Sequence, residues 1–238
     1  MIMMKEAIIL AGGYGTRLRK VVPDFPKPMA PVSGRPFLEI LFNNLIKKGI
    51  KRVVLSLGFM ADKIVNHFGS IYRDLELCYV VESFPLGTGG AIRLAMTQCT
   101  QNHIFVFNGD TYIDLEVEEI ERHWSLNRNP IIVGREVSDA SRYGGLVTSS
   151  GRIIGFAEKG MQGNGLINAG CYILNQGQLD RFPLYSAFSL ETDFFAFAVL
   201  DQSIDVFITK GYFIDIGIPE DFERAQIELS NSSLLNNS

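Results

Sequence analysis

Strand-like and helix-like segments alternate along the first 135 residues of this chain, and this alternation constrains the possible folds most. Apolar runs typical of buried strands cover residues 7–11 and 52–57, and residues 37–48 between them carry apolar side chains at helical spacing before Gly49. The pattern continues with strands at residues 77–81, 104–107 and 131–135 and with helices at residues 61–68, 89–97 and 114–127. Such alternation predicts a mostly parallel, twisted sheet with helices on both faces.

The pattern changes after Arg135. The stretch "YGGLVTSSGRIIGFAEK" indicates a hairpin about a Ser-Gly turn, and "LINAGCYIL" indicates a further strand. Short strands are expected at residues 204–208 and 212–216, and helices at residues 190–200 and 219–229. We therefore expect an α/β fold with a Rossmann-like mixed, mostly parallel sheet flanked by helices and a small β-rich lobe. Residues 1–229 should form one domain, and residues 230–238 a flexible tail.

Composition indicates a single globular domain and argues against several kinds of partner and site. The chain has 238 residues, 47% of them hydrophobic, which fits one globular domain with a full-sized core. The net charge of -4 gives no reason to expect nucleic acid as a partner. Cys78, Cys99 and Cys171 are widely spaced, so we expect small buried side chains rather than a zinc site or disulfides. No signal peptide and no apolar run of bilayer length are evident, so a cytoplasmic protein without membrane contact is expected.

A glycine-rich turn follows the first strand in "AIILAGGYGTRLR". Gly12, Gly13 and Gly15 let backbone N–H groups face an anion, and the following Arg17 and Arg19 add charged donors. Further on, Lys27 stands between two prolines in "PKPM". The turn lacks the third glycine of a dinucleotide-binding fingerprint and the Gly-Lys-Ser/Thr of a P-loop. A tight turn followed by a solvated basic loop is the alternative interpretation.

The combination "LAGGYGTRLR" with "PKPM" resembles the signature of the sugar-1-phosphate nucleotidyltransferases. The resemblance extends through "PLGTGGAI", "FNGDT", "AEKG", "INAGCYIL" and "YFIDIGIPEDFERA", and so covers nearly the whole chain. It implies a nucleotidyltransferase fold, similar to glycosyltransferase-A folds, in which the β-rich lobe binds sugar. It also implies transfer of a guanylyl group from GTP to a sugar 1-phosphate, with Mg²⁺ as cofactor. A heptose 1-phosphate is the expected acceptor, and a hexose 1-phosphate such as mannose 1-phosphate is the alternative.

The resemblance assigns roles to the nucleotide-facing residues. Arg17, Lys27 and Asp110 are expected to be catalytic, with Lys27 between the phosphates of the nucleotide and the sugar. The expected nucleotide-binding residues are Leu10, Ala11, Gly12, Gly13, Gly15, Thr16, Arg17, Glu82, Pro85, Leu86, Gly87, Thr88, Gly109 and Asp110.

Glu82 ends the third predicted strand and is a candidate for reading the base. Guanine presents two hydrogen-bond donors side by side, N1–H and the 2-amino group, and a carboxylate can accept both. Uracil and thymine present a donor beside an acceptor and suit a carboxylate less well. Two alternatives stay open, because Glu82 could be an ordinary surface glutamate and relatives that use uridine nucleotides can also carry an acid nearby.

Two aspartates are the expected metal ligands. Asp110 follows the fourth strand in "FNGDT", and Mg²⁺ prefers oxygen ligands with substrate phosphates completing its shell. Asp215 lies in an apolar run, where an unpaired charge is costly and a bound cation would relieve that cost. From the residues alone, Asp110 could instead be a turn residue and Asp215 a core residue that backbone donors satisfy. The resemblance implies that Asp110 and Asp215 bind one Mg²⁺ together. Asp114 is expected to be the N-cap of the helix that follows it.

The resemblance places the sugar phosphate among residues of the second half. The expected ligands are Gly144, Glu158, Lys159, Asn168, Glu191 and Asp193. For Glu191 and Asp193, capping of the helix that starts in "SLETDF" is the stronger interpretation.

Further residues bear on two rival functions and on a subunit contact. A glycosyltransferase should carry a D-x-D metal motif, which "DTYID" is not, and a non-catalytic subunit should have lost some of the four residues Arg17, Lys27, Asp110 and Asp215. His67, His103 and His123 show no ligand spacing. The cluster Phe188, Phe194, Phe195 and Phe197 indicates either core or a subunit interface, so a homodimer is possible.

Overall fold

The structure, a computed structural model, describes residues 4–18, 21–157, 160, 162–201 and 203–230. Arg19, Glu158 and Lys159 and most of the expected tail, residues 231–238, lie outside the described residues. None of the helices in the described ranges is both long enough and apolar enough to cross a membrane.

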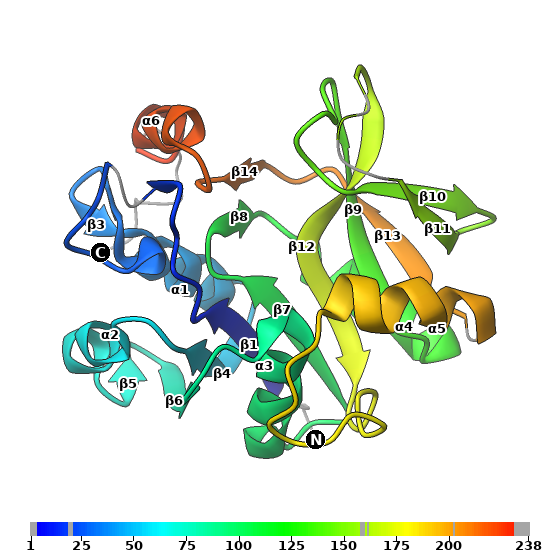
Figure 1. Cartoon of the computed structure of the whole chain (residues 1–238), viewed down its shortest axis with the longest axis horizontal. Coiled ribbons are helices and arrows are strands. Elements are labelled where there is room, and N and C mark those ends of the chain that lie inside the picture. The colour runs from blue at the N-terminus through cyan, green and yellow to red at the C-terminus, as the bar shows by residue number, and fades with distance from the viewer. Residues whose placement is uncertain (1–3, 19–20, 158–159, 161, 202, 231–238) are drawn as a thin grey trace.

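A ten-stranded mixed sheet forms the centre of the molecule (Figure 1). Its strands, in spatial order, are β10 (Gly145–Ser149), β11 (Arg152–Ala157), β13 (Asp205–Thr209), β9 (Ile131–Val137), β12 (Gly165–Asn175), β7 (His103–Asn108), β1 (Lys5–Ala11), β4 (Ile50–Leu57), β6 (Leu75–Val81) and β5 (Ile71–Tyr72). Strands β7, β1, β4 and β6 run parallel, whereas β12 is antiparallel to both β7 and β9. Two small ladders stand apart from this sheet, β2 (Pro31–Val32) with β3 (Arg35–Pro36) and β8 (Thr111–Ile113) with β14 (Phe213–Asp215).

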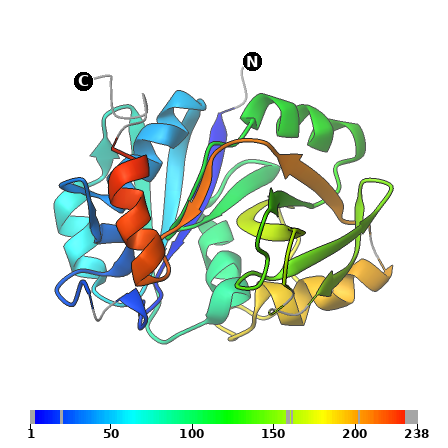
Figure 2. The ribbon, with the colours of Figure 1, turned by 90° about the horizontal axis from the view of Figure 1, so that it is seen from above.

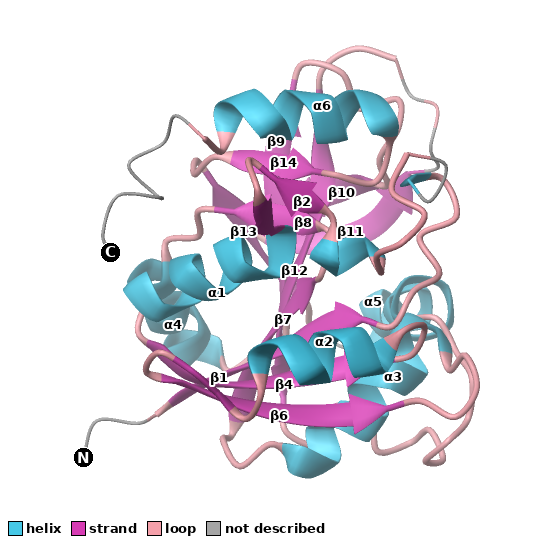
Figure 3. Ribbon diagram, turned by 90° about the vertical axis from the view of Figure 1, so that its left-hand side faces the viewer, coloured by secondary structure: helices cyan, strands magenta, loops and turns pink. Residues whose placement is uncertain are grey.

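Helices cover both faces of the sheet because successive side chains of each strand point to opposite faces. Ala7 and Ile9 of β1 pack in one apolar core and Ile8 packs in the other. The first core includes side chains of α1 (Phe37–Lys47), α2 (Ala61–Phe68), α4 (Val117–Asn127) and α6 (Pro219–Glu228), and the second includes side chains of α3 (Gly87–Ala95) and α5 (Ala196–Asp201). Figure 2 shows α6 on the same side of the molecule as α1, and Figure 3 shows α6 lying over β14 and β2. The predicted α/β class with helices on both faces is confirmed.

The later strands, which were expected to form a β-rich lobe, extend the main sheet. Strand β12 lies between β7 and β9, and the hairpin of β10 and β11 continues the sheet beyond β13. The hairpin turns at Ser150 and Gly151, as the Ser-Gly pattern predicted. The segment expected as one helix over residues 190–200 begins as a π-helical turn, Leu190–Phe195, and continues as α5.

Asp114 is not an N-cap, and that prediction is wrong. Helix α4 begins at Val117, and its N-cap position is Glu116, whose side chain makes no capping hydrogen bond. The three residues before Asp114 form β8 against β14, so the chain is still extended where the sequence pattern placed the helix start. The Asp114 carboxylate instead forms an ion pair with Lys48, at 2.6 Å between Oδ1 and Nζ.

The phenylalanine cluster belongs mostly to the core. Phe188, Phe194 and Phe195 are buried, whereas the Phe197 side chain on α5 is 61% exposed. Cys99 and Cys171 are buried, as expected, and Cys78 is partly buried. A homodimer remains a prediction.

Candidate active site

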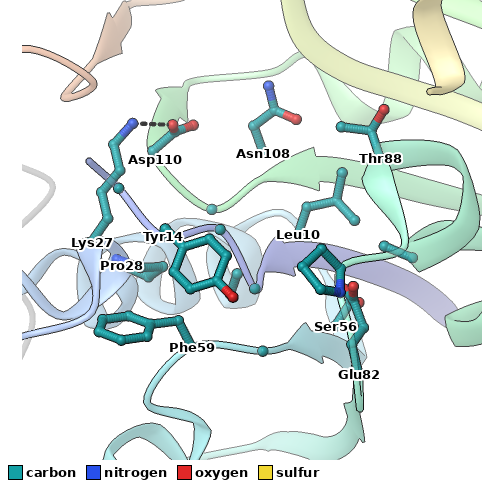
Figure 4. Close-up of a pocket in the computed structure, with 18 of the residues that line it drawn as sticks. Leu10, Tyr14, Lys27, Pro28, Ser56, Phe59, Glu82, Thr88, Asn108 and Asp110 are labelled. Atoms are coloured by element: carbon teal, nitrogen blue, oxygen red, sulfur yellow. Dashed lines mark hydrogen bonds and ion pairs between the residues drawn. The ribbon is translucent and has the colours of Figure 1, made fainter. Parts of the chain in front are cut away.

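One pocket of about 750 Å³ opens at the carboxyl ends of the parallel strands (Figure 4). Each of β1, β4, β6 and β7 is followed at once by residues that line it: Gly12 after β1, Gly58 after β4, Glu82 after β6 and Gly109 after β7. This edge of a parallel α/β sheet is where ligands bind in folds of this class. The glycine turn, the base-reading candidate and Asp110 therefore meet in one cavity, although three separate segments supply them.

The pocket has no room for larger residues at two glycines, Gly15 in the turn after β1 and Gly109 after β7. Gly15 has a φ of +58°, and a Cβ there would lie 2.9 Å from the Cβ of Lys27. A Cβ on Gly109 would lie 2.5 Å from the carbonyl oxygen of Leu10, to which the Gly109 N–H donates at 2.9 Å. The backbone at the floor of the pocket can therefore approach a ligand closely, and Arg17 lies exposed at the rim.

Lys27 and Asp110 form an ion pair on the side of the pocket opposite Glu82 (Figure 4). Lys27 begins the short 3₁₀ turn Lys27–Met29, and its Nζ donates to Oδ2 of Asp110. The Lys27 side chain is 12% exposed and that of Asp110 is 30% exposed. The ammonium is thus fixed at the pocket wall.

Asp215 lies beside this pair because β14 is paired with β8. In that ladder Asp215 is opposite Thr111, and the N–H of Ile216 donates to the carbonyl oxygen of Asp110 at 2.9 Å. Burial and the neighbouring Asp110 carboxylate raise the pKa of Asp215, and the Lys27 ammonium opposes that rise. The two aspartates are therefore neighbours, and their sharing of one Mg²⁺ stays a prediction.

The carboxylates of Asp110 and Asp215 suit a hard divalent cation that also binds the substrate phosphates. Among the described residues, the carboxylates of Asp110 and Asp215 share the ammonium of Lys27, and burial penalises the negative charge of Asp215. Within the described residues no group of three or more His, Cys, Asp or Glu side chains could hold a metal ion. The protein offers Asp110 and Asp215, which matches the way Mg²⁺ is bound through one or two carboxylates plus substrate phosphates.

Glu82 forms the other side of the pocket, together with Ser56 (Figure 4). The Ser56 hydroxyl donates to Oε1 of Glu82 at 3.1 Å, and the Leu86 N–H donates to Oε2 at 2.9 Å. Each carboxylate oxygen has two lone pairs, so one acceptor position on each stays available to a ligand. Leu86 itself is buried and does not line the pocket, so its contribution to the site is this N–H.

None of the described sugar-pocket candidates, Gly144, Asn168, Glu191 and Asp193, lines the pocket, but the segment of Asn168 lies next to it. The N–H of Asn168 donates to the carbonyl oxygen of Gly144 at 2.9 Å, and the Asn168 side chain bonds to Tyr172. Gly170, with a φ of +67°, leaves space for the Asn108 side chain, because a Cβ would lie 2.4 Å from Asn108 Nδ2. Asn108 lines the pocket, so the Asn168 segment adjoins its wall.

Asp193 caps the helical segment that starts at Leu190. Its Oδ2 accepts from the N–H of Ser189 at 2.7 Å, and the Ser189 hydroxyl accepts from the N–H of Thr192 at 3.2 Å. This is the interpretation that the sequence favoured for Asp193. Glu191 points elsewhere and accepts from Thr88, Ser189 and Tyr172.

Comparisons with known proteins decide the family. A sequence model of the family described as Nucleotidyl transferase matches residues 6–232. The chain belongs to the nucleotidyl transferase family. The family predicted from "LAGGYGTRLR" and "PKPM" is thereby confirmed.

Similar proteins match the chain along nearly its whole length. D-glycero-alpha-D-manno-heptose 1-phosphate guanylyltransferase of Aneurinibacillus thermoaerophilus is 41% identical over 227 residues, which cover 95% of this chain and 99% of that protein. The protein of the same name from Campylobacter jejuni is 38% identical over 91% of this chain and 96% of its own. The crystal structure of HddC from Yersinia pseudotuberculosis has a TM-score of 0.85 at 40% identity, covering 94% of this chain and 98% of its own. HddC has also been solved in complex with GMP-PN.

In this nucleotidyl transferase, all the predicted nucleotide-binding residues except Leu86 line the pocket. Further lining residues were not foreseen: Tyr14, Pro28, Ser56, Gly58, Phe59, Ser83, Phe84, Ala91, Asn108 and Gly217. Gly58, Phe59 and Asn108 stand at or just after strand ends, so the rule that led to Asp110 could have found them. Gly217 carried no such signal, because only the pairing of β14 with β8 brings it near Lys27.

Proposed function

We propose that this protein transfers a guanylyl group from GTP to D-glycero-α-D-manno-heptose 1-phosphate, giving the GDP-sugar and pyrophosphate for surface polysaccharide precursors. The observation that carries the proposal is the Lys27–Asp110 ion pair at one end of a pocket whose other end holds Glu82, with Asp215 next to Asp110 but outside the pocket lining. Near-complete coverage of the two heptose 1-phosphate guanylyltransferases supports the same acceptor. A cytoplasmic location, where GTP is available, goes with this proposal.

The reaction needs positioning more than proton transfer. An oxygen of the sugar 1-phosphate forms a bond to the α-phosphorus of GTP while the bond from that phosphorus to the pyrophosphate oxygen breaks. The attacking oxygen is already anionic, so no general base is required. Two anionic substrates repel each other, and the backbone turn at Gly12–Gly15 with Arg17 and Lys27 offers the donors that would hold both in line.

Asp110 and Asp215 are the residues that would hold Mg²⁺. A bound Mg²⁺ supplies neutralisation of phosphate charge and fixes the orientation of the phosphate oxygens. The Lys27 ammonium contacts Asp110. The Lys27 side chain therefore lies where the nucleotide and sugar phosphates would meet the metal ligands.

Guanine is the proposed base because of the free acceptor positions on Glu82. Ser56 and the Leu86 N–H hold the carboxylate in place, and the remaining lone pairs match the paired donors of guanine. The neighbouring HddC structure contains GMP-PN, which is consistent with a guanine nucleotide in a site of this kind. On the sugar side we propose Gly144, Glu158, Lys159 and Asn168 as ligands.

A pyrophosphate-release assay over a matrix of triphosphates and phosphorylated sugars tests the proposal. We expect the highest kcat/KM with GTP and the heptose 1-phosphate, and no release without a divalent metal. A higher kcat/KM with mannose 1-phosphate would show that the proposed acceptor is wrong but that the proposed guanylyl transfer is right. Absence of pyrophosphate release with every pair, together with sugar transfer from a nucleotide-sugar, would replace the reaction by that of a glycosyltransferase.

A further inference from the structure

A hydrogen-bond network connects the nucleotide pocket with the expected sugar ligands. At one end is Thr88, which lines the pocket at the start of α3. At the other end is Asn168 on β12. Between them lie Glu191, on the π-helical turn, and Tyr172, which is 1% exposed.

Glu191 is the centre of this network because three hydroxyl groups donate to it. The Thr88 and Ser189 hydroxyls donate to Oε2 at 2.8 and 3.0 Å, and the Tyr172 hydroxyl donates to Oε1 at 3.0 Å. The Thr88 and Ser189 oxygens in turn accept from backbone N–H groups, Leu190 to Thr88 at 2.9 Å and Thr192 to Ser189 at 3.2 Å. An ionised carboxylate only accepts, so the direction of every one of these bonds is fixed.

The direction set by Glu191 determines how Asn168 is oriented. The Tyr172 hydroxyl gives its hydrogen to Glu191, so toward Asn168 it can only accept, and it does so from Nδ2 at 3.0 Å. Oδ1 of Asn168 accepts from the N–H of Gly170 at 3.0 Å. The amide cannot turn over without losing both bonds. One N–H and one carbonyl lone pair remain for a ligand, each in a fixed direction.

We propose that Glu191 and Tyr172 are positioning residues that act on the sugar through Asn168 and thereby set which pattern of sugar hydroxyls is accepted. A ligand-facing amide of fixed orientation discriminates between a hydroxyl that donates and one that accepts at a given place, whereas a freely turning amide does not. This inference rests on the proposed function, because it presumes a sugar 1-phosphate beside Asn168. It replaces the expectation that Glu191 touches the sugar itself.

Tyr172→Phe tests the network, and Tyr112→Phe is its matched control. Both tyrosines are fully buried, but the Tyr112 hydroxyl has no hydrogen-bond partner among the described residues. For Tyr172→Phe we expect the KM for the sugar 1-phosphate to rise about tenfold, the size of effect of one lost hydrogen bond, with the KM for GTP changed less than about twofold. The ratio of kcat/KM between the heptose 1-phosphate and mannose 1-phosphate should move toward one. Tyr112→Phe should leave all three quantities unchanged.

Glu191→Gln provides a second variant of nearly unchanged size. Its amide has a single oxygen, so it cannot accept from Tyr172 and Thr88 together, and the Tyr172 hydrogen or the Thr88 hydrogen loses its acceptor. We expect the same shift in sugar KM and in acceptor preference as in Tyr172→Phe, with circular dichroism and thermal unfolding reporting whether each variant is folded.

The outcomes separate this inference from the proposed function. An active wild-type protein whose two variants keep the wild-type sugar KM and acceptor preference would overturn the positioning role alone. Equal losses for GTP and sugar would also overturn it, because they would indicate general damage to the site. A wild-type protein that releases no pyrophosphate with any sugar 1-phosphate would overturn both.

Discussion

Lys27 and Asp110 lie 83 residues apart in the chain, and their side chains form an ion pair at one end of the pocket. The contact exists because the turn Lys27–Met29 and the end of β7 meet at the same edge of the sheet. Asp215 adds a second carboxylate beside it through the ladder of β14 and β8. In the described part of the chain, one ammonium thus faces two carboxylates, and this imbalance of charge underlies the first two predictions.

Asp215→Asn should stabilise the metal-free protein. Burial and Asp110 raise the pKa of Asp215, so between its ordinary and its raised pKa the native state holds a proton that the unfolded state has lost. The free energy of unfolding therefore falls as the pH rises through that window, and the penalty is fully present above it. We expect the variant to melt a few degrees (about 2–5 °C) higher at pH ~7 in EDTA, since its amide carries no charge. Calorimetry over a pH series measures the difference.

The control for that variant is Asp114→Asn. Asp114 pairs with Lys48 away from the pocket, so its loss should not raise the melting temperature. A stabilisation by Asp215→Asn that is the same at every pH would contradict the assigned cause.

The activity of Asp215→Asn should fall about 100-fold or more, the loss usual for removing one group that stabilises transition-state charge.

Asp110→Asn should weaken the dependence on divalent metal and the rate together. The variant loses one proposed metal ligand and also the partner of Lys27. We expect the Mg²⁺ concentration at half-maximal rate to rise about tenfold or more, as for loss of one carboxylate ligand. The measurement is the initial rate of pyrophosphate release against Mg²⁺ concentration. An unchanged metal titration would mean that Asp110 is only a turn residue with an ion pair.

The sequence predicted those parts of the site that depend on local pattern. The glycine turn follows β1 and Asp110 follows β7, and the rule that ligands bind at the carboxyl ends of parallel strands placed both correctly in the pocket. Asp114 was misassigned because an acid just before a helical pattern is typical of an N-cap. The strand β14 that pairs with β8, and Lys48, which pairs with Asp114, come from distant parts of the chain.

What the sequence could not supply are the contacts between distant segments. Nothing local indicates that β12 lies between β7 and β9 and so completes a single ten-stranded sheet. The same holds for Glu191, for which helix capping or sugar contact were the local interpretations. Its partners Thr88 and Tyr172 come from α3 and β12, and only the folded chain brings these hydroxyls to one carboxylate.

Arg17→Ala should lower turnover strongly without affecting the fold. Arg17 is exposed at the pocket rim, so its removal costs little packing, while the variant loses a charged donor for the triphosphate. We expect kcat/KM for GTP to fall about 100-fold, as for removal of one donor to transition-state charge, with an unchanged melting temperature. Arg73→Ala, at the edge of the sheet between β5 and β6, is the control that should keep full activity. Normal activity of Arg17→Ala would remove this residue from the mechanism.

Glu82→Gln should relax the preference for guanine. The carboxylate accepts from Ser56 and the Leu86 N–H and keeps one free acceptor position on each oxygen for the paired guanine donors. A glutamine keeps one oxygen but places an NH₂ group where the second acceptor was, so one guanine donor would face a donor. We expect the ratio of kcat/KM for GTP over UTP to fall about tenfold, consistent with one hydrogen bond lost and left unpaired. Assays of both proteins with GTP, UTP, CTP and dTTP measure this ratio. Equal use of all four triphosphates by the unmodified protein would show that Glu82 only connects the ends of β4 and β6. The same conclusion would follow if Glu82→Gln lost activity with every triphosphate in equal proportion.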